Sequence, residues 1–174
     1  MANIKFLKRL SVEQVEESQD LAPKFDSDGI IPCITKHFET QEVLMFAYMN
    51  EESMKLTISS GFAHYWSRSR KKLWKKGETS GMFQEVKRML IDDDQDCLVI
   101  EVLLCPPIGG GNESSCHVGY RSCFYREVPL GKSDKPERLL EFIEDRKSFD
   151  PENEPNRSKR DVSKTGTGYS FLSF

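Results

Sequence analysis

The alternation of apolar and polar positions along the chain predicts a body made mainly of strands. Residues 43–49 are apolar without periodicity and are bounded by polar residues, which is typical of a strand buried on both faces. Strands are also expected over residues 63–67, 83–91 and 97–105, which are rich in β-branched and aromatic residues or alternate in polarity. The sequence KFDSDG predicts a turn before a further apolar stretch at residues 30–35.

Two helices are predicted by their capping residues. Ser11 followed by Gln14 resembles a capping box and predicts a short helix through about Ser18. Asn50 is the expected N-cap of a second helix, which begins with two glutamates and ends at Gly61. A strand followed directly by a short helix is therefore expected here.

The C-terminal part of the chain differs in character from the rest. Leu139, Leu140 and Ile143 have helical spacing, which predicts a helix over residues 136–147. Residues 148–174 are polar and charged until the final YSFLSF, so we expect a mobile tail with one aromatic end.

Length, charge and cysteine content narrow the class of protein. A chain of 174 residues fits one domain with a short remainder. The net charge of −3 disfavours a basic nucleic-acid-binding protein, and no apolar run reaches the roughly 18 residues of a membrane span. The start, MANIKFLKRL, lacks the pattern of a secretory signal, so we expect a cytoplasmic protein with no membrane partner. Its five cysteines are then expected to be thiols or metal ligands.

Four carboxylates stand within the string DDDQD at residues 92–96. Such a cluster repels itself unless a cation is present, and oxygen-rich sites favour hard ions such as Mg²⁺. On an extended backbone Asp92, Asp94 and Asp96 point to one side and Asp93 points to the other. A solvated acidic turn is the alternative that this segment alone leaves open.

The string CHVGYRSC places Cys116, His117 and Cys123 close together. Two thiolates with an adjacent imidazole suit Zn²⁺, although the spacing is not that of a zinc finger. A third ligand must come from elsewhere in the chain or from a partner subunit, which leaves a coordination position for water. Two buried structural cysteines are the alternative reading of the motif alone.

Residues 66–81, WSRSRKKLWKKGETSG, combine six basic side chains with hydroxyl groups and glycines. Arginine makes forked contacts to phosphate, lysine adds a point charge, and small residues let backbone donors approach closely. The segment is expected to bind phosphate, either of a metabolite or of single-stranded RNA, and a basic surface hairpin is the alternative. The candidate residues are Trp66, Ser67, Arg68, Ser69, Arg70, Lys76, Glu78, Thr79 and Ser80.

In this order, LMFAYMNEES, WSRSRKKLWKKGETSG, DDDQD and CHVGYRSCFYR resemble phosphoribosyl-AMP cyclohydrolase, which opens the adenine ring in histidine biosynthesis. The resemblance covers about residues 21–128. It implies an α+β, β-dominated pseudobarrel capped by short helices, in a homodimer of intertwined chains with metal sites at the interface. The chain would then comprise an N-terminal extension (1–20), a catalytic domain (21–130), and a C-terminal helix and tail (131–174).

The resemblance also implies a substrate and a set of roles. The substrate is an adenine nucleotide carrying a second phosphoribosyl group on N1, and water attacks C6 so that the C6–N1 bond breaks. His117 is expected to shuttle protons, and a histidine that only orients the site is the alternative. The implied Mg²⁺ ligands are Asp92, Asp94 and Asp96, and the implied Zn²⁺ ligands are Cys116, Cys123 and a donor from across the dimer interface.

This chain departs from the commonest family pattern at the third zinc ligand. The family places a cysteine between the first two magnesium aspartates, where this chain has Asp93. Because a carboxylate can bind zinc, Asp93 is the first choice, and Cys97, about 13 Å further along an extended strand, is the second. The loop at residues 106–115 is also longer than usual.

Two other functions stay open from the sequence. One is a non-catalytic RNA- or nucleotide-binding module in which zinc is structural, against which the acidic cluster and the net charge argue. The other is a related hydrolase that acts on a different modified purine nucleotide.

Overall fold

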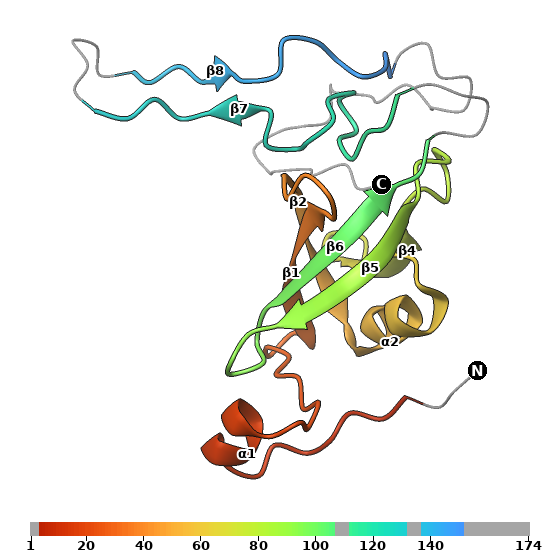
Figure 1. The fold of residues 1–174 in the computed structure, drawn as a ribbon, viewed down its shortest axis with the longest axis vertical. Coiled ribbons are helices and arrows are strands. Elements are labelled where there is room, and N and C mark those ends of the chain that lie inside the picture. Colours follow the sequence, from red (N-terminus) through yellow and green to blue (C-terminus); the bar gives the residue numbers. More distant parts are fainter. Residues whose placement is uncertain (1–3, 107–111, 132–136, 152–174) are drawn as a thin grey trace.

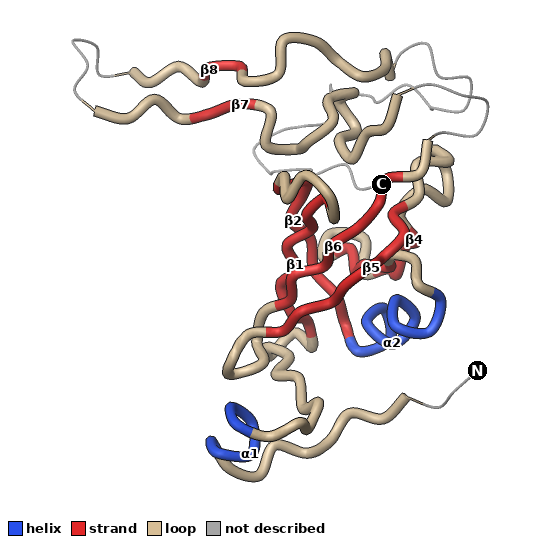
Figure 2. Tube along the Cα trace, in the orientation of Figure 1, coloured by secondary structure: helices blue, strands red, loops and turns tan. Residues whose placement is uncertain are grey.

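The computed structural model describes residues 4–106, 112–131 and 137–151, which form one curled sheet, two helices and a separate two-stranded ribbon (Figure 1). The helices are α1 (Val12–Glu17) and α2 (Glu51–Ser60). The sheet contains β1 (Ile30–His37), β2 (Val43–Asn50), β3 (His64–Ser67), β4 (Lys72–Lys75), β5 (Gln84–Ile91) and β6 (Leu98–Leu104). The ribbon pairs β7 (Arg126–Glu127) with β8 (Glu141–Phe142). Strands outnumber helices throughout (Figure 2), so the predicted β-dominated α+β class is confirmed.

The six strands lie in the order β4-β3-β2-β1-β6-β5, and β1 and β6 are the one parallel pair among them. The sheet curls because the segment just before β3 also bonds to β5. The Ala63 N–H donates to the Gln84 carbonyl at 3.0 Å, and the Val86 N–H donates to the Gly61 carbonyl at 2.7 Å. These bonds bring the two sides of the sheet together into a half-barrel, in agreement with the predicted pseudobarrel.

The concave face of the sheet holds the hydrophobic core. Fully buried apolar side chains come from every central strand, and α2 covers them with Met54. Burial of such side chains stabilises the fold by roughly 1.5–3 kcal/mol each. The largest are Ile31, Leu44, Met49, Tyr65, Leu98, Ile100 and Val102.

The predicted caps of both helices are confirmed. The Ser11 side chain accepts a hydrogen bond from the Gln14 N–H at the start of α1. Asn50 and Ser53 form a reciprocal capping box at the start of α2, and Gly61 ends that helix with φ of 72°. Glycine adopts this left-handed backbone conformation freely because it has no Cβ.

The prediction that the apolar run in β2 is buried on both faces is wrong. Leu44 and Met49 face the core, but Phe46 is 47% exposed. The Phe46 ring packs edge-on against Tyr48, with centroids 5.1 Å apart, and the Arg68 guanidinium lies over Tyr48. One face of β2 is therefore an apolar outer surface of this chain, which hydrophobicity alone does not distinguish from core.

The predicted helix over residues 136–147 is also wrong. Residue 136 lies outside the described ranges, and from residue 137 the chain runs extended into β8. Leu139 and Ile143 are 79% and 58% exposed. Despite their helical spacing, these side chains do not pack against the core. Instead, the Phe142 ring of β8 joins Tyr120 and Tyr125, whose rings stack 3.9 Å apart.

Of the tail predicted to be mobile, residues 152–174 lie outside the described ranges, and the N–H groups of Ser148 and Phe149 donate to the Gly119 carbonyl in the cysteine motif. The described ranges contain no helix with the length and apolar character needed to cross a lipid bilayer.

Candidate functional site

The cysteine loop (residues 114–123) brings the Cys116 and Cys123 thiols into hydrogen-bond contact. Two backbone bonds close the loop: the Ser115 N–H donates to the Arg121 carbonyl at 2.8 Å, and the Cys116 N–H donates to the Tyr120 carbonyl at 3.3 Å. The Cys123 N–H donates to the Leu44 carbonyl of β2 at 2.7 Å, which fixes the loop to the sheet. The spacing of the motif therefore produces a paired sulfur site.

The pKa values of the two thiols are shifted in opposite directions. Hydrogen bonding from Cys123, supported by His117, lowers the pKa of Cys116, whereas donation to Cys116 raises the pKa of Cys123. These shifts favour the thiolate form at Cys116. Because thiolates are the sulfur form that binds zinc, this arrangement fits the predicted metal.

A chain of buried polar groups lies beneath the loop. The Thr35 and Tyr65 hydroxyls are 2.8 Å apart, the Tyr65 hydroxyl donates to Gln84, and the Gln84 amide donates to the Ser115 hydroxyl at 2.7 Å. Burial raises the pKa of Tyr65, so its hydroxyl keeps its proton. This series of hydrogen bonds links the core of the sheet to Ser115, the residue that precedes Cys116.

Lys76 reaches the same loop from the basic segment. Its side chain is buried, and its ammonium group donates to the Ser115 carbonyl at 2.7 Å. Its positive charge also lowers the pKa of Cys123, against the stronger effects that raise it. Lys76 thus supports the cysteine loop, a role that the sequence did not indicate.

The other residues of the basic segment lie in two places. Trp66 and Ser67 end β3, and Ser67 accepts from the Arg70 N–H and faces the Ser69 hydroxyl in the turn to β4. Arg68 lies over Tyr48 on the outer face of β2. The remaining candidates, Glu78, Thr79 and Ser80, occupy the turn that follows β4.

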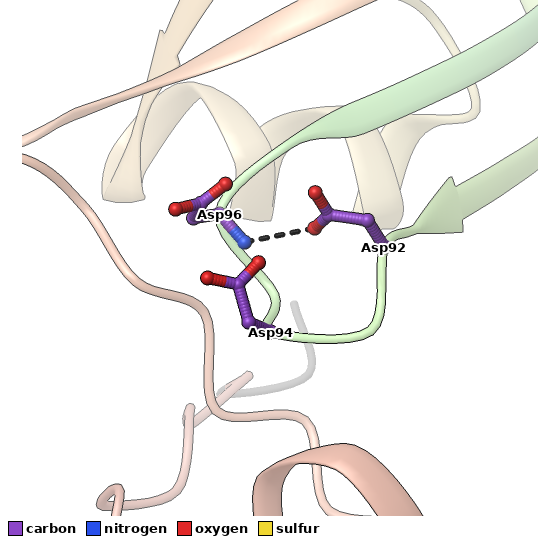
Figure 3. A group of neighbouring side chains, drawn as sticks. All are labelled: Asp92, Asp94 and Asp96. Carbon is purple, nitrogen blue, oxygen red and sulfur yellow. Dashed lines mark hydrogen bonds between the residues drawn. The ribbon is translucent and has the colours of Figure 1, made fainter.

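The acidic turn between β5 and β6 brings three carboxylates together, with one oxygen of each of Asp92, Asp94 and Asp96 within 4.8 Å of the others (Figure 3). Asp92 accepts hydrogen bonds from the N–H groups of Asp96 and Cys97, both at 2.9 Å. Asp93 is exposed. Converging carboxylate oxygens are the ligands that Mg²⁺ takes in proteins, so the donor set fits the predicted metal.

Lys24, which no motif in the sequence marks, forms ion pairs with the acidic turn. Its ammonium group lies 3.1 Å from Asp94 and 2.8 Å from Asp96. These bonds raise the pKa of Lys24, and the Asp96 pKa is lowered chiefly by its bond to Lys24.

Gln95 holds the N-terminal extension against this turn. Its backbone is left-handed (φ 58°), and its side chain is buried and bonds Ala22, Val15 and Asp20. No pattern in the sequence marks these long-range contacts.

The acidic turn and the cysteine loop lie at opposite ends of the sheet (Figure 1). The seven residues of β6 separate the two ends by about 20 Å. Both candidates for a third zinc ligand, Asp93 and Cys97, are at the acidic end. Within one chain the structure therefore does not bring either of them to Cys116 and Cys123.

An open cleft of about 630 Å³ lies beside the cysteine loop, between that loop and the segment after β8. Arg121 crosses it and forms ion pairs with Glu42 at 2.9 Å and Glu113 at 3.3 Å. Asn112 and Glu144 also line the cleft.

Comparisons with known proteins agree with these motifs. The family model described as phosphoribosyl-AMP cyclohydrolase matches residues 45–125, which contain the acidic turn and the cysteine loop.

Three similar relatives carry that name. The protein of Methanocella arvoryzae is 56% identical over 108 residues, 62% of this chain and 84% of the relative. That of Caulobacter sp. (strain K31) is 52% identical over 112 residues, 64% of this chain and 80% of the relative. That of Rhizobium etli (strain CIAT 652) is 45% identical over 138 residues, 79% of this chain and 87% of the relative. With identity this high across most of each relative, the chain belongs to the phosphoribosyl-AMP cyclohydrolase family of enzymes.

Proposed function

We propose that this enzyme hydrolyses the adenine ring of 1-(5-phosphoribosyl)-AMP in histidine biosynthesis, with water adding at C6 and the C6–N1 bond breaking. The names of its relatives support this substrate. The observation that carries the proposal is the contact between the Cys116 and Cys123 thiols, with His117 bonded to Cys116. The comparisons favour this reaction over the RNA-binding module considered from the sequence.

Cys116 and Cys123 would hold Zn²⁺ as two of its three protein ligands. Bound zinc supplies water with a pKa of about 7 and hence hydroxide near neutral pH. His117 stands beside the pair, and in our proposal it moves the proton of the attacking water toward N1, which must gain a proton as the C6–N1 bond breaks.

Asp93 is proposed as the third zinc donor and Cys97 as the second choice, in either case from the other chain of a homodimer. The separation of the acidic turn from the cysteine loop supports a donor from a second chain. Apolar side chains exposed in this chain, such as Phe46 and Leu130, which is 92% exposed, support an association surface. Burial raises the pKa of the Cys97 thiol, with a further contribution from Asp92, which makes Cys97 the poorer donor.

Asp92, Asp94 and Asp96 would hold Mg²⁺, which when bound offsets negative charge such as that of substrate phosphates. The proposed phosphate-binding side chains are those that the sequence indicates in the basic segment, at the end of β3, in the β3–β4 turn, at Lys76 and in the turn after β4. A cytoplasmic location stays a prediction from the sequence.

The proposed function is tested by zinc content and turnover measured on the same samples. Purified protein is assayed by elemental analysis and by ultraviolet absorbance with the authentic nucleotide. Cys116→Ser and Cys123→Ser should lose zinc and ring opening together, whereas Cys105→Ser, a thiol outside the loop, should keep both. Full turnover by zinc-free protein would contradict the mechanism, and zinc-loaded protein without turnover would contradict the substrate.

A further inference from the structure

A segment that begins in the ribbon crosses over the cysteine loop. This C-terminal strap (residues 141–149) begins with β8 and leaves the ribbon where the Ile143 N–H donates to the Tyr125 carbonyl at 3.0 Å. The ring of Phe142 anchors it against Tyr120 and Tyr125. The strap therefore reaches the loop from the side opposite β2.

The Glu144 carboxylate binds two consecutive backbone N–H groups of the loop. One oxygen accepts from the Arg121 N–H and the other from the Ser122 N–H, each at 2.9 Å. Hydrogen bonds to a charged acceptor are about twice as strong as neutral ones. Without Glu144, two adjacent donors would lose their acceptor directly before Cys123.

Cys123 is consequently held from both sides. Its own N–H donates to the Leu44 carbonyl of β2, while the two preceding N–H groups donate to the strap. The Ser122 hydroxyl adds a bond to the Val43 carbonyl at 2.7 Å. The backbone path into Cys123 is therefore set jointly by a core strand and by Glu144.

The strap also touches the loop midway between the two cysteines. The N–H groups of Ser148 and Phe149 both donate to the Gly119 carbonyl, at 2.6 and 3.2 Å. A Cβ on Gly119 would lie 2.2 Å from the Phe149 carbonyl oxygen. The contact is close enough that the loop and the strap fix one another.

We propose that Glu144 is a positioning residue that sets the distance between the Cys116 and Cys123 sulfurs by fixing the Arg121–Ser122 backbone. This role rests on the proposed function in so far as the two sulfurs are zinc ligands. Glu144 touches neither the metal nor the substrate in this proposal. It acts through the backbone, as partners that orient metal ligands do.

The test compares Glu144→Gln with Glu141→Gln. Glutamine keeps the shape of the side chain but replaces one acceptor oxygen by an N–H₂ group that would face a backbone N–H. Glu141 lies on β8, is exposed, and its backbone pairs with Glu127, so it provides the same substitution on the same strap. Circular dichroism and thermal unfolding establish that both variants fold.

Zinc affinity is measured by competition with a chromophoric chelator, and ligand geometry by the absorption bands of the cobalt-substituted protein. Loss of a partner that orients a ligand weakens metal affinity by roughly 10- to 100-fold, and we expect that range for Glu144→Gln. Its thiolate-to-cobalt bands should shift, while Glu141→Gln should match the wild type. Unchanged affinity and unchanged bands in Glu144→Gln would overturn the positioning role, even if its melting temperature fell.

Amide hydrogen exchange of the zinc-free protein separates this inference from the proposed function. The N–H groups of Arg121 and Ser122 should exchange faster in Glu144→Gln than in the wild type or Glu141→Gln. If the wild type binds no zinc, the proposed function fails, whereas faster exchange still supports positioning of the loop by Glu144. Unchanged exchange would refute it whatever the metal content.

Discussion

The Lys76 ammonium group donates to the carbonyl oxygen of Ser115, 2.7 Å away, one residue before Cys116. A lysine of the basic segment is thus turned inward, and its charge is buried under the loop that carries the paired thiols. This contact gives Lys76 a supporting role at the cysteine loop, alongside the phosphate contact proposed for the basic segment.

Replacing Lys76 should destabilise the protein. Lys76→Met leaves the Ser115 carbonyl without this donor, and an unsatisfied buried acceptor costs about 1–3 kcal/mol. Lys72→Met, on the exposed edge strand β4, should change the free energy of unfolding by less than about 0.5 kcal/mol. Urea unfolding of both variants in a metal chelator measures the difference. Equal stability of the two would contradict the support assigned to Lys76.

Gly119 should tolerate alanine less well than Gly61. Both have positive φ, 106° and 72°, so both substitutions carry backbone strain of roughly 1–2 kcal/mol. Only at Gly119 does the added Cβ also meet backbone, because nothing lies within 4 Å of the position at Gly61. Gly119→Ala should therefore weaken zinc binding, whereas Gly61→Ala should lower the melting temperature and leave zinc affinity unchanged. Full zinc affinity in Gly119→Ala would show that the strap does not press on the loop.

Removing the Lys24 charge should tighten Mg²⁺ binding severalfold. The ammonium group bonds Asp94 and Asp96, so an incoming cation must displace it. Lys24→Met removes this competitor and the charge repulsion, while Lys8→Met, which changes an exposed lysine of the N-terminal extension, is the control. Isothermal titration calorimetry with Mg²⁺ measures both. Weaker binding in Lys24→Met would mean that Lys24 shapes the turn for the ion instead of competing with it.

Mixing two inactive variants should restore activity if the zinc site is shared between chains. In a mixed dimer of Cys116→Ser and Asp93→Ala, one of the two sites receives an intact thiol pair from one chain and an intact Asp93 from the other. With random exchange, half of the dimers are mixed, so about a quarter of wild-type turnover should return, as expected for two-fold dimers with two equivalent interfacial sites.

Cys97→Ala in place of Asp93→Ala distinguishes the two candidate donors. If Asp93 is the ligand, Cys97→Ala chains keep zinc and turnover on their own. A mixture of Cys116→Ser and Asp93→Ala that stays inactive after subunit exchange would exclude Asp93 as a donor from the second chain.

The sequence predicted those parts of the fold that depend on interactions between residues close together in the chain. The Ser11 and Asn50 caps, Gly61, and the strands that became β2, β3, β5 and β6 are confirmed, because each is specified by neighbouring residues. The helix over residues 136–147 failed because three apolar residues at helical spacing do not form a helix without a core to cover. The short strand β4 was not predicted because three of its four residues are Lys or Trp in a run taken for a binding segment.

The candidate site was predictable only as motifs. Cys116 and Cys123 meet because their spacing closes a loop, and alternate carboxylates of the acidic turn converge for a similar local reason. Gln84, Lys24 and Glu144 were missed because each reaches its site across more than 20 positions of sequence. No residue pattern records such contacts.

The placement of the acidic turn and the cysteine loop at opposite ends of one sheet has a consequence for how the enzyme works at low concentration. If each zinc site needs the cysteine loop of one chain and the acidic turn of another, a single folded chain carries halves of two different sites. Such a chain is inactive alone. Turnover per chain would then fall on dilution below the dissociation constant of the dimer, although every domain stays folded. The total activity would therefore rise more steeply than in proportion to the concentration of the chain.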